Sequence, residues 1–161
     1  MTLLNAPTYD ATGERRKLGL LIVGGVVLAL GFLLGIGGFL LGHGWFFSNL
    51  PAEHTVSNFF TALETKDYAT AYGIWMHDPK WQEHPDKYDY KLKRFTEDWT
   101  TASDFGPIRS HHVDISKTDG TGNFGTGIIV AVRVNGDHKL FMWYQKSDHT
   151  LTYPAPHQLE Y

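Results

Sequence analysis

The strongest hydrophobic pattern in the chain is an uninterrupted apolar run near its beginning. Residues 18–41 read LGLLIVGGVVLALGFLLGIGGFLL and contain no charged or strongly polar side chain. At about 1.5 Å per residue, a helix of this length reaches roughly 36 Å, enough to cross a hydrocarbon core of about 30 Å. The run is longer than the apolar region of a cleaved signal peptide, and no A-x-A-like cleavage site follows it. The pattern therefore predicts one uncleaved transmembrane helix over residues 18–42.

Basic residues on one side of this run predict its orientation. Arg15, Arg16 and Lys17 precede it directly, whereas the first lysine after it is Lys66. Basic residues are enriched on the cytoplasmic side of membrane helices. We therefore expect residues 1–17 to be a cytoplasmic tail and the domain that follows the helix to be periplasmic or extracellular.

A linker at the membrane surface is expected over residues 43–51. Tryptophan and other aromatic side chains gather at the boundary between hydrocarbon and water. The residues that would form this interfacial anchor are Trp45, Phe46 and Phe47.

After the linker, the spacing of apolar residues predicts three helices. The first is entered through Pro51 and carries on one face Val56, Phe59, Phe60 and Leu63. The second follows the N-cap residue Asp67 and repeats the same spacing in Tyr68, Ala71, Tyr72 and Trp75. The third is expected over residues 90–101. Between the last two, residues 77–88 contain two prolines and predict a loop with one short helical turn.

Beyond Gly106 the period of the pattern changes to two, which is typical of strands. Strands are expected over residues 108–116, 124–134 and 140–146. Asn135 and Gly136 predict a two-residue hairpin turn, which would place Val134 opposite Asp137. Residues 153–161, YPAPHQLEY, contain two prolines and are expected to run as an extended C-terminal tail.

Helices followed by an antiparallel meander predict the α+β class. Two stretches carry a resemblance to a known family: F-x-x-A-L-x-x-x-D-Y-x-x-A-Y from Phe59 to Tyr72, and F-x-x-D-W…G-x-I from Phe95 to Ile108. Over residues 52–152 the chain resembles the nuclear transport factor 2-like superfamily. This resemblance implies two or three helices packed into a curved antiparallel sheet, here tethered to a membrane. Fold signatures of this kind do not define an activity.

Composition excludes several classes of protein. Lys plus Arg number 14 and Asp plus Glu number 17, so the net charge of −3 argues against nucleic-acid binding. The absence of cysteine excludes disulfide scaffolds, thiol nucleophiles and cysteine-ligated metals. A hydrophobic share of 42% is sufficient for a packed core.

The resemblance also suggests where an active site would lie. Isomerase and dehydratase members hold a buried carboxylate or histidine beside a tyrosine or second acid, and the candidates are Asp98, Tyr72, His112 and Asp114. In a strand, His112 and Asp114 share one face, and the opposite face is apolar. We therefore expect these two residues to point to solvent, although His111 would then accompany the core face. No catalytic residue is predicted.

Histidine and glycine clusters do not predict a metal or cofactor site. His77, Asp78, Glu83 and His84 share one loop but lack the i, i+4 histidine spacing of a helical zinc site. The adjacent residues His111 and His112 would point to opposite faces of a strand. Glycines between Gly120 and Gly127 lead into a strand and are interpreted as turn and bulge positions. No Ser–His–Asp constellation is evident, so no metal and no cofactor are expected.

A stripe of glycines runs along the apolar segment. On a helix of 3.6 residues per turn, five of them fall within about 40° of Gly24. They are Gly24, Gly31, Gly35, Gly38 and Gly42. Such a stripe lets a second membrane helix approach closely, so a partner helix is expected against this face.

Two functional hypotheses follow from the sequence. The first is a non-catalytic, single-span accessory subunit of a membrane complex, which contacts lipid and other integral membrane subunits, or further copies of itself, and carries an external interaction domain. The alternative is a membrane-tethered small-molecule-binding or isomerase/dehydratase-like domain. A buried ionisable group between the helices and the curved sheet would favour the alternative. A cavity filled by aromatic side chains at this place would oppose it. Those side chains are Phe59, Phe60, Trp75 and Trp99.

Overall fold

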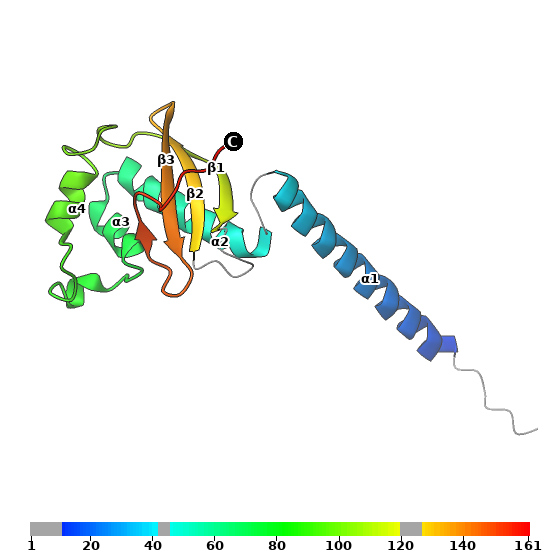
Figure 1. Ribbon diagram of the computed structural model, residues 1–161. Helices are drawn as coiled ribbons and strands as arrows, with labels where there is room; N and C mark the ends of the chain where they lie inside the picture. The colour runs from blue at the N-terminus through cyan, green and yellow to red at the C-terminus, as the bar shows by residue number, and fades with distance from the viewer. Residues whose placement is uncertain (1–10, 42–45, 120–126) are drawn as a thin grey trace, which may run out of the picture.

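A long helix leads into three shorter helices and a sheet (Figure 1). The computed structural model describes residues 11–41, 46–119 and 127–161. The main helices are α1 (Ala11–Leu40), α2 (Phe46–Glu64), α3 (Tyr68–Trp75) and α4 (Leu92–Asp98), and one 3-10 turn, η2, covers Trp81–Glu83. The strands are β1 (His111–Thr118), β2 (Gly127–Val134), β3 (His138–Gln145) and β4 (Leu151–Thr152). The predicted α+β class is confirmed.

Helix α1 projects away from the other elements (Figure 1). Within its segment Thr12–Leu40, an 18-residue window has a mean hydropathy of 2.6, and the segment is long and apolar enough to cross a membrane. Only 6% of its apolar window is buried, unlike the core helix of a soluble domain. The helix begins seven residues before the apolar run, and Glu14 lies in its first turn, where a negative charge favours the helix dipole.

Helix α2 begins at Phe46, five residues before Pro51, where the sequence predicts its start. Pro51 lies inside the helix and supplies no N–H for the helical hydrogen bond. A buried polar contact holds this first part in place: the Asn49 amide donates to Ser116 Oγ at 3.0 Å and accepts from Thr118 Oγ1 at 3.3 Å. Part of the expected linker is therefore helical and attached to β1. Trp45 lies outside the described residues.

The predictions for α3 and the loop after it are confirmed. The Asp67 carboxylate accepts a hydrogen bond from the Thr70 backbone N–H at 3.0 Å, as an N-cap does. Ala71 and Tyr72 face the core. The third helix, α4, is shorter than predicted, but its central Phe95 is fully buried.

The four strands form an antiparallel sheet in the order β1-β2-β3-β4. The helix-facing side of β2, β3 and β4 supplies much of the core: Ile128, Val130, Val132, Val134, Leu140, Met142, Tyr144 and Leu151. Helix α2 packs against this side. The sequence predicts three of the strands and misses β4, which has only two residues.

The hairpin between β2 and β3 departs from the predicted register. Val134 pairs with His138 rather than Asp137, so the loop contains three residues instead of two. Asn135 and Gly136 both have positive φ, as the turn prediction requires. The Asn135 side chain also bonds to three backbone groups of the segment before β1: it donates to the carbonyls of residues 105 and 107 and accepts from the N–H of residue 109. These bonds hold Asn135 against that segment.

Residues 153–161 cross the outer face of the sheet from β3 to β1 (Figure 1). The Ala155 N–H donates to the Phe141 carbonyl at 2.8 Å, and the Tyr161 hydroxyl donates to Asp114 at 2.7 Å. Asp114 sits in a β-bulge, and its side chain is 7% exposed beneath Arg133. The expectation that Asp114 points freely to solvent is therefore wrong, because the chain's own tail covers it.

Candidate functional site

The space between α2, α3, α4 and the sheet is filled by aromatic side chains. Phe59 and Phe60 are completely buried and Trp99 is 4% exposed. The Phe59 ring centroid lies 5.2 Å from that of Phe60, 5.5 Å from that of Trp75 and 5.1 Å from that of Trp99. Aromatic packing of this kind opposes a catalytic pocket between the helices and the sheet.

The four acid–base candidates do not meet at one point. Tyr72 donates its hydroxyl to the carbonyl of Tyr90, and burial raises the pKa of the Tyr72 hydroxyl. Asp98 accepts from the Tyr90 hydroxyl at 2.9 Å and pairs with Arg94. His112 lies on β1 with 70% of its side chain exposed, as expected from the strand alternation. Asp114 is bound by Arg133 on the outer face of the sheet.

A Ser–His–Glu chain of hydrogen bonds joins α2 to β1. The sequence patterns described above do not predict it. His111 Nε2 lies 3.0 Å from Ser57 Oγ, and His111 Nδ1 lies 2.6 Å from Glu64 Oε1. The His111 side chain is 12% exposed and its ring stacks on Phe60 with centroids 5.7 Å apart. Glu64 follows Ser57 by seven residues, which is two helical turns. That spacing is the one sequence signal for this contact.

The geometry of the Ser–His–Glu chain of hydrogen bonds favours a structural role for these three side chains. A serine nucleophile needs backbone N–H donors aimed at the developing oxyanion. Ser57 lies in the middle of α2, where backbone N–H groups are bonded to helix carbonyls. The hydrogen bonds instead fix the His111 ring and hold β1 against α2. His111 is largely buried and is already partnered on both ring nitrogens.

Asp78 organises the loop that contains His77, Glu83 and His84. Its carboxylate accepts from the Tyr88 hydroxyl and binds His84, both at 2.7 Å, and it also binds Lys87. These hydrogen bonds, with that from Tyr88 the strongest, hold the pKa of Asp78 well below its usual value. Glu83 pairs with Lys80 instead. Within the described residues, no group of three or more histidine and acidic side chains is arranged to hold a metal ion.

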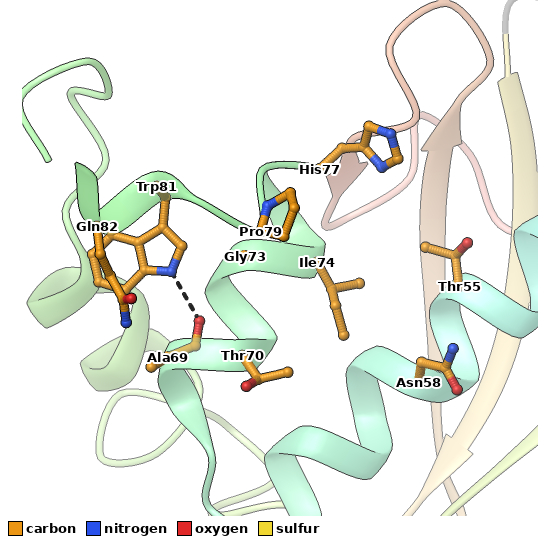
Figure 2. A pocket seen from close by; sticks show the side chains of 10 residues that line it. All are labelled: Thr55, Asn58, Ala69, Thr70, Gly73, Ile74, His77, Pro79, Trp81 and Gln82. Carbon is orange, nitrogen blue, oxygen red and sulfur yellow. Dashed lines mark hydrogen bonds between the residues drawn. The ribbon is translucent and has the colours of Figure 1, made fainter. Parts of the chain in front are cut away.

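A groove of about 430 Å³ lies between α2, α3 and the loop after α3, and its lining side chains are drawn in Figure 2. Trp81 closes one end, where its Nε1 donates to the Ala69 carbonyl at 3.1 Å. Two of the polar side chains that line the groove bond within their own helix: Thr55 donates to the Pro51 carbonyl and Asn58 bonds to His54.

A second cavity, of about 390 Å³, opens where α3, α4 and the segment after β4 meet. We call it the aromatic cavity, and it is lined by Trp75, Tyr90, Asp98, Trp99, Ala102, Phe105 and Tyr153. Five of these seven side chains are aromatic and one is a carboxylate. Burial, and then the nearby Asp98, raise the pKa of the Tyr90 hydroxyl, so Tyr90 stays protonated and donates to that carboxylate. Sequence patterns assign Trp75 and Trp99 to the core, but the contribution of Tyr153 depends on where the tail folds.

The glycine stripe of α1 has an open part and a part that is buried within the chain. A Cβ atom added at Gly24 or Gly31 would meet no other atom within 4 Å. Gly35 and Gly38 are buried, and Gly38 lines a cleft with Leu50 of α2. The half of the stripe nearest α2 is thus already covered, whereas Gly24 and Gly31 are open. Gly42 lies outside the described residues.

The fold and these sites define an α+β domain preceded by one helix that is apolar enough to cross a membrane. No family model, curated protein or solved structure matches the chain. Its function is therefore inferred from the contacts described above.

Proposed function

We propose that the protein is a single-span, non-catalytic accessory subunit of a membrane complex, anchored and docked through α1. The observation that carries this proposal is the surface of α1, whose large apolar side chains are more than 40% exposed from Leu18 to Leu41. Apolar surface of this extent is costly in water and requires lipid or other membrane helices around it. The open glycines Gly24 and Gly31 allow a helix of another membrane subunit to approach closely.

The external domain supports a binding role rather than catalysis. Its interior is packed with aromatic rings, and Ser57 of its Ser–His–Glu chain lies within α2, where backbone N–H groups are bonded to helix carbonyls. Helices on one face of an antiparallel sheet support the assignment to the nuclear transport factor 2-like superfamily, whose fold serves many functions. In this proposal, the domain contacts neighbouring subunits outside the membrane.

The orientation is tested by protease protection. Because Arg15, Arg16 and Lys17 lie at the start of α1, we expect the N-terminal tail to be cytoplasmic. Trypsin added to spheroplasts, whose outer envelope has been opened, should cleave the external domain, for example after the exposed Lys80, and leave an N-terminal epitope tag intact. In permeabilised spheroplasts the tag should also be lost. Protection of the domain in unpermeabilised spheroplasts would reverse the orientation.

Docking is tested by substitution of an open glycine. Gly31→Ile places a branched side chain at the point of closest helix approach, so we expect the variant to insert into the membrane but to lose at least about nine-tenths of its co-purifying partner. Gly31 is preferred to Gly35 and Gly38 because those two are buried within the chain itself. The measurement is quantitative mass spectrometry after gentle detergent extraction.

The matched control for this experiment is Gly25→Ile. Gly25 is also open but lies about 100° from Gly24 around the helix, on another face. This variant should retain the partner. Equal retention by both variants would show that α1 does not carry the association.

A further inference from the structure

The lining of the aromatic cavity is a continuous arc of rings. Tyr90 neighbours Trp75 with centroids 6.4 Å apart, and Trp75 neighbours Trp99 at 5.8 Å. Trp99 neighbours Tyr153 at 5.8 Å, and Tyr153 neighbours Phe105 at 6.2 Å. The arc joins α3, α4 and the segment after β4, which are distant in sequence. It forms one wall of a cavity that is large enough for a small organic molecule.

The angles between the rings decide which ligand shape fits. Neighbouring planes are inclined by 49°, 69°, 53° and 78° along the arc. A sugar ring stacks on one flat and open aromatic face, which this curved wall does not offer. Rings that turn around a concave wall instead suit a compact, rounded group such as trimethylammonium. Aromatic cages are known to bind quaternary ammonium ions through cation–π attraction.

The charges around the cavity also favour a cation. Asp98 lines it directly. Burial raises the pKa of the Tyr153 hydroxyl, and the negative charge of the nearby Asp104 raises it further. The Arg94 guanidinium pairs with Asp98, with its Nε 3.0 Å from Asp98 Oδ1. The Arg94 side chain is 66% exposed and does not line the cavity. Asp104 adds a second carboxylate near Tyr153, which favours a negative potential beside the rings.

We propose that the aromatic cavity binds the quaternary ammonium group of a small organic cation, with the ring arc as the cage and Asp98 as the counter-ion. The cage is formed by Trp75, Trp99 and Tyr153, with Tyr90 and Phe105 at its ends. Helices α3 and α4, which supply Trp75 and Asp98 to the lining, lie on the side of the domain away from α1 (Figure 1). This position favours a free solute, such as choline or a betaine, over a choline headgroup in the membrane that α1 would span. The site does not depend on docking through α1.

The test is isothermal titration calorimetry on the full chain in a maltoside detergent, which carries no quaternary ammonium group. Tetramethylammonium, choline and glycine betaine are titrated, together with 3,3-dimethyl-1-butanol, the uncharged carbon analogue of choline. We expect at least one of the three ammonium compounds to bind and the uncharged analogue to bind at least about tenfold more weakly, because the cation–π attraction is lost. Equal affinity for choline and its uncharged analogue would overturn the proposal.

Variants locate the binding. Tyr153→Leu removes a ring from a residue that is 38% exposed, and we expect it to weaken binding about 3- to 30-fold. Tyr153→Phe keeps the ring and should retain affinity, whereas Asp98→Asn removes the counter-ion and should weaken binding. The matched control is Phe141→Leu, a half-buried aromatic residue of β3 outside the cavity, which should bind normally.

Two further results would overturn the proposal. The first is unchanged affinity in both Tyr153→Leu and Asp98→Asn, which would place any binding elsewhere. The second is the absence of binding by all three ammonium compounds at tens of millimolar while circular dichroism shows a folded protein. A comparison of phosphatidylcholine vesicles with phosphatidylglycerol vesicles separates a free solute from a choline headgroup. Binding to the phosphatidylcholine vesicles without binding of free choline would overturn the assignment to a solute.

Discussion

Phe59→Ala is expected to lower the free energy of unfolding by about 3–5 kcal/mol. Phe59 is completely buried and its ring touches four other aromatic rings, those of Phe60, Trp75, Phe95 and Trp99. Removing it leaves a cavity at the centre of this cluster that rigid neighbouring rings cannot fill. Urea unfolding of the full chain in detergent, followed by near-UV circular dichroism of the tryptophans, measures the change.

The control for this variant is Thr61→Ala. Thr61 lies on the exposed side of the same helix, where substitutions change stability by less than about 0.5 kcal/mol. A loss below about 1 kcal/mol for Phe59→Ala would show that the aromatic cluster is not the core of the domain.

Gly127→Ala is expected to cost about 1–3 kcal/mol, although it adds a single methyl group. A Cβ atom at this position would lie 2.2 Å from Cζ2 of Trp143, so the indole ring must move. The ring is held in place because its Nε1 donates to Gln145 Oε1 at 2.8 Å, and the residue is 9% exposed. The same urea titration provides the measurement.

A second background tests whether the collision with Trp143 is the cause. In Trp143→Leu the ring is absent, so adding Gly127→Ala should cost markedly less than in the unaltered protein. The two substitutions would then be non-additive, as expected for residues in contact. Additive costs would trace the effect of Gly127→Ala to the backbone of β2 instead.

Local patterns in the sequence predict the regular elements because those elements depend on neighbouring residues. The spacing of Tyr68, Ala71, Tyr72 and Trp75, with Asp67 before them, predicts α3 and its N-cap. The run rich in valine and isoleucine likewise predicts a strand over residues 124–134, of which β2 covers Gly127–Val134. Sequence alone indicates a turn or bulge position at Gly127, whereas its role is to make room for Trp143, sixteen residues later.

Contacts between distant residues are what these patterns miss. Ser57 and His111 are 54 positions apart and meet only because β1 lies against α2. Asp114 is covered because Tyr161, 47 positions later, returns to it across the sheet. The aromatic cavity is of the same kind, since Tyr153 reaches Trp99 only after the chain has passed through four strands. Candidate sites of this protein are made by such returns of the chain, which no local period encodes.

The return of the chain also limits how two copies could associate by strand addition. The edge of β3 is occupied by β4 at Trp143 and Tyr144 and by the Ala155 N–H at Phe141. At the opposite edge, the bulge at Asp114 interrupts the regular ladder of β1, and bulges of this kind discourage pairing with another molecule. Growth of a continuous intermolecular sheet is therefore blocked along most of β3 and disfavoured at β1. Copies of this domain can therefore come close together without joining through their strands.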